Sequence, residues 1–120
     1  MPAILLVDDD ADLGEALTEA LLLEGCEVRR TDTLAEAVSL ASRLSPRLIL
    51  VDYQLPGVDV SELIARLRQA VSAPIVLCTG MEDASELSAA MGADGVLAKP
   101  FSIEDLLRLV RPSRHPAATP

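Results

Sequence analysis

Five polar side chains that could act together in chemistry stand directly after short apolar segments of the sequence. They are Asp8, Asp9, Asp52, Thr79 and Lys99. Two carboxylates about 4 Å apart repel each other by roughly 4 kcal/mol at an effective dielectric near 20. A hard cation such as Mg²⁺, which takes one or two carboxylates together with waters and phosphate oxygens, would remove that repulsion. The three aspartates therefore indicate a cation site, provided that the fold brings them together.

The same residue types suit the transfer of a phosphoryl group. A carboxylate beside Mg²⁺ can be a nucleophile toward phosphorus, because aspartyl phosphates are a known kind of covalent intermediate. Such transfer is catalysed mainly by positioning and by neutralising charge on the equatorial oxygens, which Lys99 and the Thr79 hydroxyl could do. Taken singly, Asp52 before "QLPG" is typical of a turn, and Lys99 before Pro100 is typical of a solvated lysine. The chemical interpretation therefore depends on all five meeting at one place.

Short apolar segments alternate with longer segments of helical spacing along the chain. The predicted strands are 4–7, 27–31, 48–51, 75–78 and 96–98, of which 27–31 is the most polar and is typical of an edge strand. Helices are predicted around 13–21, 34–41, 63–71, 84–91 and 103–110, the fourth being the weakest. This alternation predicts an α/β fold with a single doubly wound, five-stranded parallel sheet. Because the carboxyl ends of parallel strands meet at one edge, the five polar side chains should converge there.

Polar residues at the ends of these segments predict where the helices begin and end. The spacing of a capping box, or a near variant, is present in Thr33 with Glu36, Asp59 with Glu62, Asp83 with Glu86, and Ser102 with Asp105. Asp10 and Asp12 are most simply the acidic start of the first helix, and Gly25 is expected to close it as its C-terminal cap. The aspartates near the N-terminus therefore divide into a pair for the cation site and a pair for the helix.

The composition of the 120-residue chain bounds its class and its partners. Half of the residues are hydrophobic, which predicts one compact domain. A net charge of −9 and the scarcity of aromatic residues argue against direct nucleic-acid binding by this domain. No apolar run is long enough for a membrane helix and no signal peptide is recognisable, so we expect a cytoplasmic protein without membrane contact. The two cysteines, Cys26 and Cys78, make no disulfide framework, and Cys78 is expected to be a buried free thiol.

Four motifs carry a resemblance to a known family. The segments "ILLVDDD", "LILVDYQLPGVD", "VLCTG" and "VLAKPF", in this order and spacing, resemble the receiver domain of two-component response regulators. The resemblance implies a flavodoxin-like (βα)5 fold with the strand order 2-1-3-4-5, the order known for a chemotaxis regulator. The resemblance covers about residues 3–110, so we expect a receiver domain over residues 1–111. Residues 112–120, with three prolines and no apolar periodicity, are expected to be a tail or linker.

The resemblance implies a signalling domain that catalyses its own phosphorylation and dephosphorylation, not an enzyme acting on a separate substrate. Asp52 would take a phosphoryl group from a histidine kinase or a phosphotransfer protein. Mg²⁺, or Mn²⁺ in its place, would be held by Asp8, Asp9, Asp52 and the main-chain carbonyl of Gln54. Asp9 would be a direct ligand, and Asp8 would act through water.

The remaining site residues would bind the phosphoryl group and pass on its arrival. Lys99 would contact the phosphoryl oxygens, its bond to Pro100 would be cis, and Thr79 would move inward to hydrogen-bond the phosphoryl group. The surface of the fourth helix, fifth strand and fifth helix would then change its binding to a downstream protein target or output domain. The resemblance leaves a homodimer open.

Two positions depart from the commoner pattern of the family. Val96 stands where an aromatic side chain often rotates between outward and inward positions, which puts signal output by aromatic rotation in question. Val60 replaces the glycine that often follows the loop aspartate, here Asp59, which predicts a changed loop after the site. Gln54 and Met81 flank the reactive position and are expected to tune the lifetime of the phosphoryl group.

Other functions are compatible with parts of the sequence. A phosphorylation-independent protein-binding module would keep the site without using it; the complete set of five residues argues against this, and Val96 mildly favours it. An aspartyl phosphatase of the haloacid dehalogenase type requires an acidic residue two positions after its nucleophile. Gln54 occupies that position after Asp52, which argues against this alternative. A P-loop enzyme is excluded because the sequence contains no G-x-x-x-x-G-K-[ST].

Overall fold

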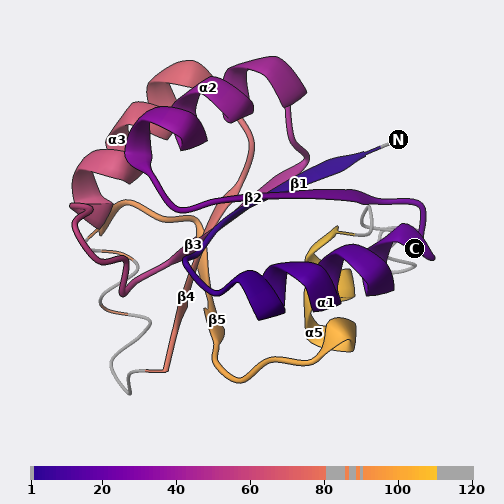
Figure 1. The fold of residues 1–120 in the computed structure, drawn as a ribbon. Helices are drawn as coiled ribbons and strands as arrows, with labels where there is room; N and C mark the ends of the chain where they lie inside the picture. Colours follow the sequence, from indigo (N-terminus) through magenta and orange to yellow (C-terminus); the bar gives the residue numbers. More distant parts are fainter. Residues whose placement is uncertain (1, 81–85, 87–88, 90, 111–120) are drawn as a thin grey trace, which may run out of the picture.

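From residue 3 to residue 79, strands and helices alternate along the chain as the sequence predicts (Figure 1). The computed structural model describes residues 2–80, 86, 89 and 91–110. The elements are β1 (Ala3–Val7), α1 (Ala11–Leu22), β2 (Glu27–Thr31), α2 (Leu34–Leu44), β3 (Leu48–Asp52), α3 (Val60–Ala70), β4 (Ile75–Thr79), β5 (Gly95–Ala98) and α5 (Ile103–Val110). The helix expected around 84–91 lies largely outside the described residues, as do Met81, Asp83 and the expected tail 112–120.

The strands form one five-stranded parallel sheet in the order β2-β1-β3-β4-β5. The doubly wound prediction and the implied strand order 2-1-3-4-5 are both confirmed. The chain runs outward from β1 to β2 and then crosses back to β3 on the other side of β1, so the strand order reverses between β1 and β3. Open α/β sheets bind ligands in the crevice beyond the carboxyl ends of the strands at such a reversal.

Both faces of the sheet are covered, with α2 and α3 on one face and α1 and α5 on the other (Figure 1). Successive side chains of a strand point to opposite faces, so Leu5 packs in the α2 and α3 cluster while Ile4 and Leu6 pack in the α1 and α5 cluster. Every residue of β1, β3 and β4 is buried. Because each large apolar side chain contributes roughly 1.5–3 kcal/mol on full burial, this packing fixes the carboxyl ends of these strands in place.

The strand β2 lies at the edge of the sheet, as its polar sequence predicts. Val28 and Thr31 are buried, whereas Arg30 is exposed. The carbonyl of Thr31 accepts a hydrogen bond from the Asp8 N–H at 2.9 Å, just past the last residue of β1. The edge strand therefore holds the start of the loop that follows β1.

The helix starts follow the predicted capping residues. Main-chain N–H groups donate to the side chains of Asp10 (from Leu13, 3.1 Å), Thr33 (from Glu36, 3.2 Å), Asp59 (from Glu62, 3.1 Å) and Ser102 (from Asp105, 3.1 Å). These side chains satisfy N–H groups that have no partner within the helix. Asp10 is thus the N-cap of α1 and Asp12 lies in its first turn, which confirms their separation from the pair Asp8 and Asp9.

The end of α1 differs in detail from its prediction. The sequence predicts Gly25 as the C-terminal cap, but the helix ends at Leu22 and its cap is Leu23. Gly25 has a φ of 80°, and the N–H groups of Gly25 and Cys26 donate to the carbonyls of Leu22 and Leu21 at 3.0 and 2.9 Å. Gly25 therefore terminates the helix from the turn beyond it, because only that position needs the left-handed backbone that glycine adopts freely.

Candidate functional site

The carboxyl edge of the sheet contains a cleft of about 530 Å³. Its lining residues come from four segments and are Asp9, Asp52, Gln54, Thr79, Gly80 and Lys99. Asp52 and Thr79 are the last residues of β3 and β4, and Asp9 and Lys99 follow β1 and β5. Asp8 joins this group through Lys99. The structure thus brings together all five polar side chains that the sequence places at strand ends.

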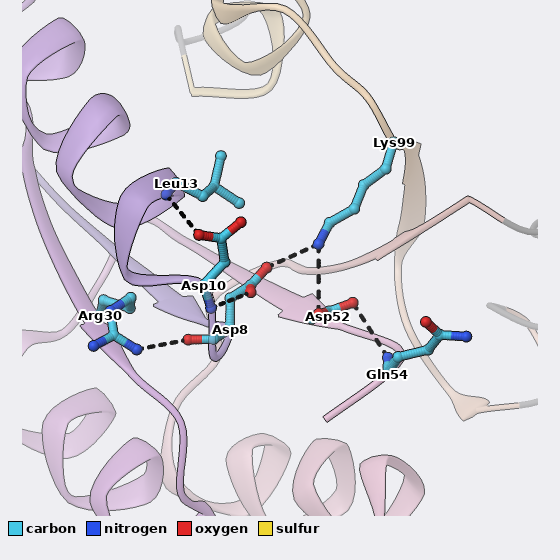
Figure 2. A network of polar contacts seen from close by, with 7 residues as sticks. All are labelled: Asp8, Asp10, Leu13, Arg30, Asp52, Gln54 and Lys99. Carbon is cyan, nitrogen blue, oxygen red and sulfur yellow. Dashed lines mark hydrogen bonds and ion pairs between the residues drawn. The ribbon is translucent and has the colours of Figure 1, made fainter. Parts of the chain in front are cut away.

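Asp8 is the most deeply buried acidic group of the site, with 1% of its surface exposed. One carboxylate oxygen accepts the Asp10 N–H at 2.9 Å, and the other accepts the Lys99 ammonium at 3.0 Å. Figure 2 shows Lys99 reaching from β5 to a point between Asp8 and Asp52. A buried carboxylate without partners would be costly, so Lys99 offsets much of the burial cost of Asp8.

Asp52 also pairs with Lys99, at a longer distance than Asp8 does. Its Oδ2 lies 3.4 Å from the Lys99 Nζ, and its Oδ1 accepts the Gln54 N–H at 3.2 Å. Burial raises the pKa of Asp52 above its usual range, and the charge of Asp8 adds to this, against the opposing effects of Gln54 and Lys99. The ionised form of Asp52 is therefore short of stabilising contacts in the folded protein.

The pKa of Lys99 is also shifted by its contacts with the two carboxylates. Burial alone would lower its pKa, but the hydrogen bond and charge of Asp8, together with Asp52, outweigh burial and raise it above the usual range. The ammonium therefore stays charged, and one positive charge is shared by two carboxylates. With Asp9 in the same cleft, the acidic groups exceed the basic ones.

The three aspartates form a group that could hold a metal ion. Single carboxylate oxygens of Asp8, Asp9 and Asp52 all lie within 4.8 Å of one another. An all-oxygen donor set with excess negative charge fits a hard divalent cation and not a soft one. The nearby Cys78 does not join the set, because burial raises the pKa of its thiol to about 12 and keeps it protonated.

Comparison with known proteins decides the family. Residues 4–111 match the family model of the response regulator receiver domain. The chain belongs to this family.

The receiver domain is similar to the DNA-binding response regulator MtrA of Mycolicibacterium paratuberculosis, with 36% identity over 110 residues, covering 90% of this chain and 49% of MtrA. It is 34% identical to the KDP operon transcriptional regulatory protein KdpE of Escherichia coli, over 99% of this chain and 55% of KdpE. The chain therefore spans about half the length of these curated relatives. Among solved structures, the receiver domain of the TMAO respiratory system response regulator TorR matches with a TM-score of 0.79 and 28% identity, over 90% of this chain and 92% of that one.

Three further features of the receiver domain concern residues around the cleft. The Lys99–Pro100 peptide bond is cis. Val96 pairs with Leu77 in the register of β5 on β4 and is partly buried. Val60, the first residue of α3, is 5% exposed and packs in the core, so its side chain fills space that a glycine would leave.

Among the described helices, none is long and apolar enough to cross a membrane.

One contact of the site has no counterpart in the sequence predictions. The Nη1 of Arg30 donates to the main-chain carbonyl of Asp8 at 2.9 Å (Figure 2). Arg30 lies on the edge strand, where a charged residue is expected to face water, and no spacing rule links it to Asp8. The sequence signal that accompanies it is a glycine, Gly14, within the helical pattern of α1.

Removing the lysine should destabilise the metal-free protein. We expect Lys99→Met to lower the free energy of unfolding by about 1–3 kcal/mol, because it leaves the buried Asp8 carboxylate without its cation. Urea unfolding in the presence of EDTA measures this loss. In the double variant Asp8→Asn with Lys99→Met both charges are gone, so its loss should be smaller; an equal or larger loss would contradict the assigned pairing.

Neutralising Asp52 should have the opposite effect on stability. Because its pKa is raised on folding, Asp52 favours the folded state below the ordinary aspartate range of about 4 and loses that contribution as the pH rises through its folded pKa. Asp52→Asn should therefore be more stable than wild type at neutral pH in EDTA, with a gain that vanishes in acid. Thermal unfolding across this pH range measures it.

Asp94 offers a control of opposite sign. The Ile75 N–H, with Arg68, holds the pKa of Asp94 below its usual range. Its contribution is present above the ordinary aspartate range and is lost as the pH falls through the folded pKa. Asp94→Asn should therefore lower stability at neutral pH, and a shift of the same sign in both variants would contradict the two assignments.

Proposed function

We propose that this receiver domain accepts a phosphoryl group on Asp52 from a histidine kinase or a phosphotransfer protein, in a reaction that depends on Mg²⁺. The observation that carries the proposal is the meeting of Asp8, Asp9, Asp52 and Lys99 at one cleft, at the reversal of the strand order. Membership of the receiver family supports it. We assign the domain to residues 1–111 and its location to the cytoplasm.

In this proposal Asp52 is the nucleophile. One of its carboxylate oxygens forms a bond to phosphorus while the bond from phosphorus to the donor nitrogen breaks, and the donor imidazole keeps the electron pair. The raised pKa of Asp52 makes its ionised carboxylate more basic, and so a better nucleophile, than an ordinary aspartate. Bound Mg²⁺ would neutralise charge on the reacting oxygens. Asp9, Asp8 and the Gln54 carbonyl are the groups that would hold it.

Lys99 and Thr79 are the proposed partners of the phosphoryl oxygens. The Lys99 ammonium already lies 3.4 Å from Asp52 and stays charged, so it can move from the carboxylates to the new phosphoryl group. Thr79, which is buried at the end of β4, lines the same cleft. Its carbonyl accepts the Lys99 N–H at 3.0 Å, which couples the two strand ends. An inward shift of Thr79 would therefore also displace the end of β5.

A phosphodonor experiment tests the phosphoacceptor. Incubation with acetyl phosphate and Mg²⁺ should add one phosphoryl group, detected by intact-protein mass spectrometry, and Asp52→Asn should abolish it. Asp10→Asn is the matched control, because this nearby aspartate caps α1 and asparagine caps equally well. Labelling that survives in Asp52→Asn, or that needs no divalent cation, would refute the proposal.

A second candidate is a protein-binding module that does not use phosphorylation. The observation that favours it is Val96, which has no ring to exchange between two positions on β5. Hydrogen exchange of amides in β4 and β5 separates the candidates, with beryllofluoride and Mg²⁺ as a phosphoryl mimic. Slower exchange around Thr79 in wild type but not in Asp52→Asn supports the switch, and unchanged exchange in both supports the binding module.

The output of the switch is proposed from its relatives and its surface. MtrA and KdpE are named as DNA-binding and transcriptional regulators. A domain with a net charge of −9 does not bind DNA by bulk electrostatics. We therefore propose that the surface of β5, α5 and the helix expected around 84–91 passes the signal to a protein target, an output domain or a second copy of the chain.

A further inference from the structure

Asp8 is held from two sides. On the side of the cleft, Lys99 contacts its carboxylate at 3.0 Å. On the side of β2, the Arg30 side chain donates to the main-chain carbonyl of Asp8 at 2.9 Å. The main-chain N–H of Asp8 donates to the Thr31 carbonyl, also at 2.9 Å. Figure 2 shows Arg30 and Lys99 approaching Asp8 from opposite directions. Two consecutive residues of β2 therefore fix the main chain of Asp8.

The carbonyl that Arg30 contacts belongs to the peptide that joins Asp8 to Asp9. A peptide unit is planar, so fixing its oxygen fixes the direction of the following N–H and of the next Cα atom. That Cα atom carries the Asp9 side chain, which lines the cleft. The hydrogen bond from Arg30 thus sets how the two neighbouring carboxylates are presented to the same point.

Gly14 provides the path for the Arg30 side chain. A Cβ atom at this position of α1 would lie 2.7 Å from the Cδ and 3.3 Å from the Nε of Arg30, so the arginine side chain would have to shift to make room for it. Gly14 is an interior residue of the helix, where glycine is less favourable than alanine. The helix therefore carries an unfavourable residue at a position that the Arg30 side chain packs against.

We propose that Arg30 is a positioning residue for the metal site, and that Gly14 is required because it leaves room for it. Arg30 orients the Asp8–Asp9 peptide so that both carboxylates can serve one cation. This role rests on the proposed function, because it presumes that the cleft binds Mg²⁺. Charge alone predicts the reverse, since a nearby guanidinium repels a cation and its removal would strengthen binding. The sign of the effect therefore separates positioning from electrostatics.

Binding of Mg²⁺ alone, measured by isothermal titration calorimetry, tests the role of Arg30. Arg30→Met keeps most of the apolar stem and should raise the Kd for Mg²⁺ by about 10-fold, the lower end of the effect of losing a contact that orients a metal ligand. Arg29→Met is the matched control: this neighbouring arginine pairs with Glu27 at 3.2 Å, and its loss should leave the Kd unchanged. An unchanged or lower Kd in Arg30→Met would overturn the proposal.

Gly14→Ala tests the same contact without removing any charge. Alanine is the better helix former, so thermal stability should stay the same or rise while the displaced arginine weakens Mg²⁺ binding. A merely structural role would lower stability and affinity together. The double variant Gly14→Ala with Arg30→Met should bind Mg²⁺ as Arg30→Met does, because both changes break one contact. Losses that add in the double variant would overturn the link between the two residues.

Wild-type protein separates this inference from the function it rests on. If wild type binds Mg²⁺ and Arg30→Met binds it equally well, the positioning role is wrong and the proposed function stands. If wild type does not bind Mg²⁺, the proposed function is refuted and the positioning role falls with it. If acetyl phosphate phosphorylates Asp52 in wild type and Arg30→Met binds Mg²⁺ more weakly, both the proposed function and the positioning role are supported.

Discussion

Repulsion between buried carboxylates is the constraint on which the site depends. Asp8 and Asp52 stand at the ends of adjacent strands, and Asp8 is almost fully shielded from water. In such a place the effective dielectric is lower than in water, so the attraction of opposite charges and the repulsion of like charges are both stronger. Lys99 answers this repulsion with one ammonium shared by both carboxylates. The cleft is left with more negative charge than its own lysine can balance, which is the state that a divalent cation would relieve.

The topology of the sheet brings these charged residues to one place. A parallel sheet brings every carboxyl end to one edge, and the order β2-β1-β3-β4-β5 makes β1 and β3 neighbours at its centre. Lys99 reaches them from β5, the far edge strand, across the end of β4. The buried apolar residues of β1, β3 and β4 hold these ends in register. The apolar residues of the strands thus stabilise the fold, while the carboxylates at and just beyond the strand ends repel one another and destabilise it.

How much could be predicted from the sequence follows from the range of each interaction. Strand ends and helix caps depend on residues a few positions apart, so the meeting of Asp52, Thr79 and Lys99 and the cap at Asp10 follow from pattern and topology. Contacts between elements that are distant in the chain leave no such pattern. Arg30 reaches Asp8 across 22 positions, and Arg68 of α3 bonds Gly92 across 24. Both depend on side-chain conformations that only the folded structure sets, and the departure from glycine at Val60 acquires its meaning only from the core it fills.

The run of aspartates after β1 shows how position alone gives one residue type three roles. Asp8 is buried and bonded at its N–H, its carbonyl and both carboxylate oxygens, so it cannot move away from its neighbours. Asp9 is exposed at the mouth of the cleft, and Asp10 caps α1. Because the main chain is pinned by β2 on one side and by the start of α1 on the other, the loop does not relax the repulsion by shifting. A cation that enters the cleft would relieve the repulsion, and it would find the carboxylate oxygens of Asp8, Asp9 and Asp52 already within 4.8 Å of one another.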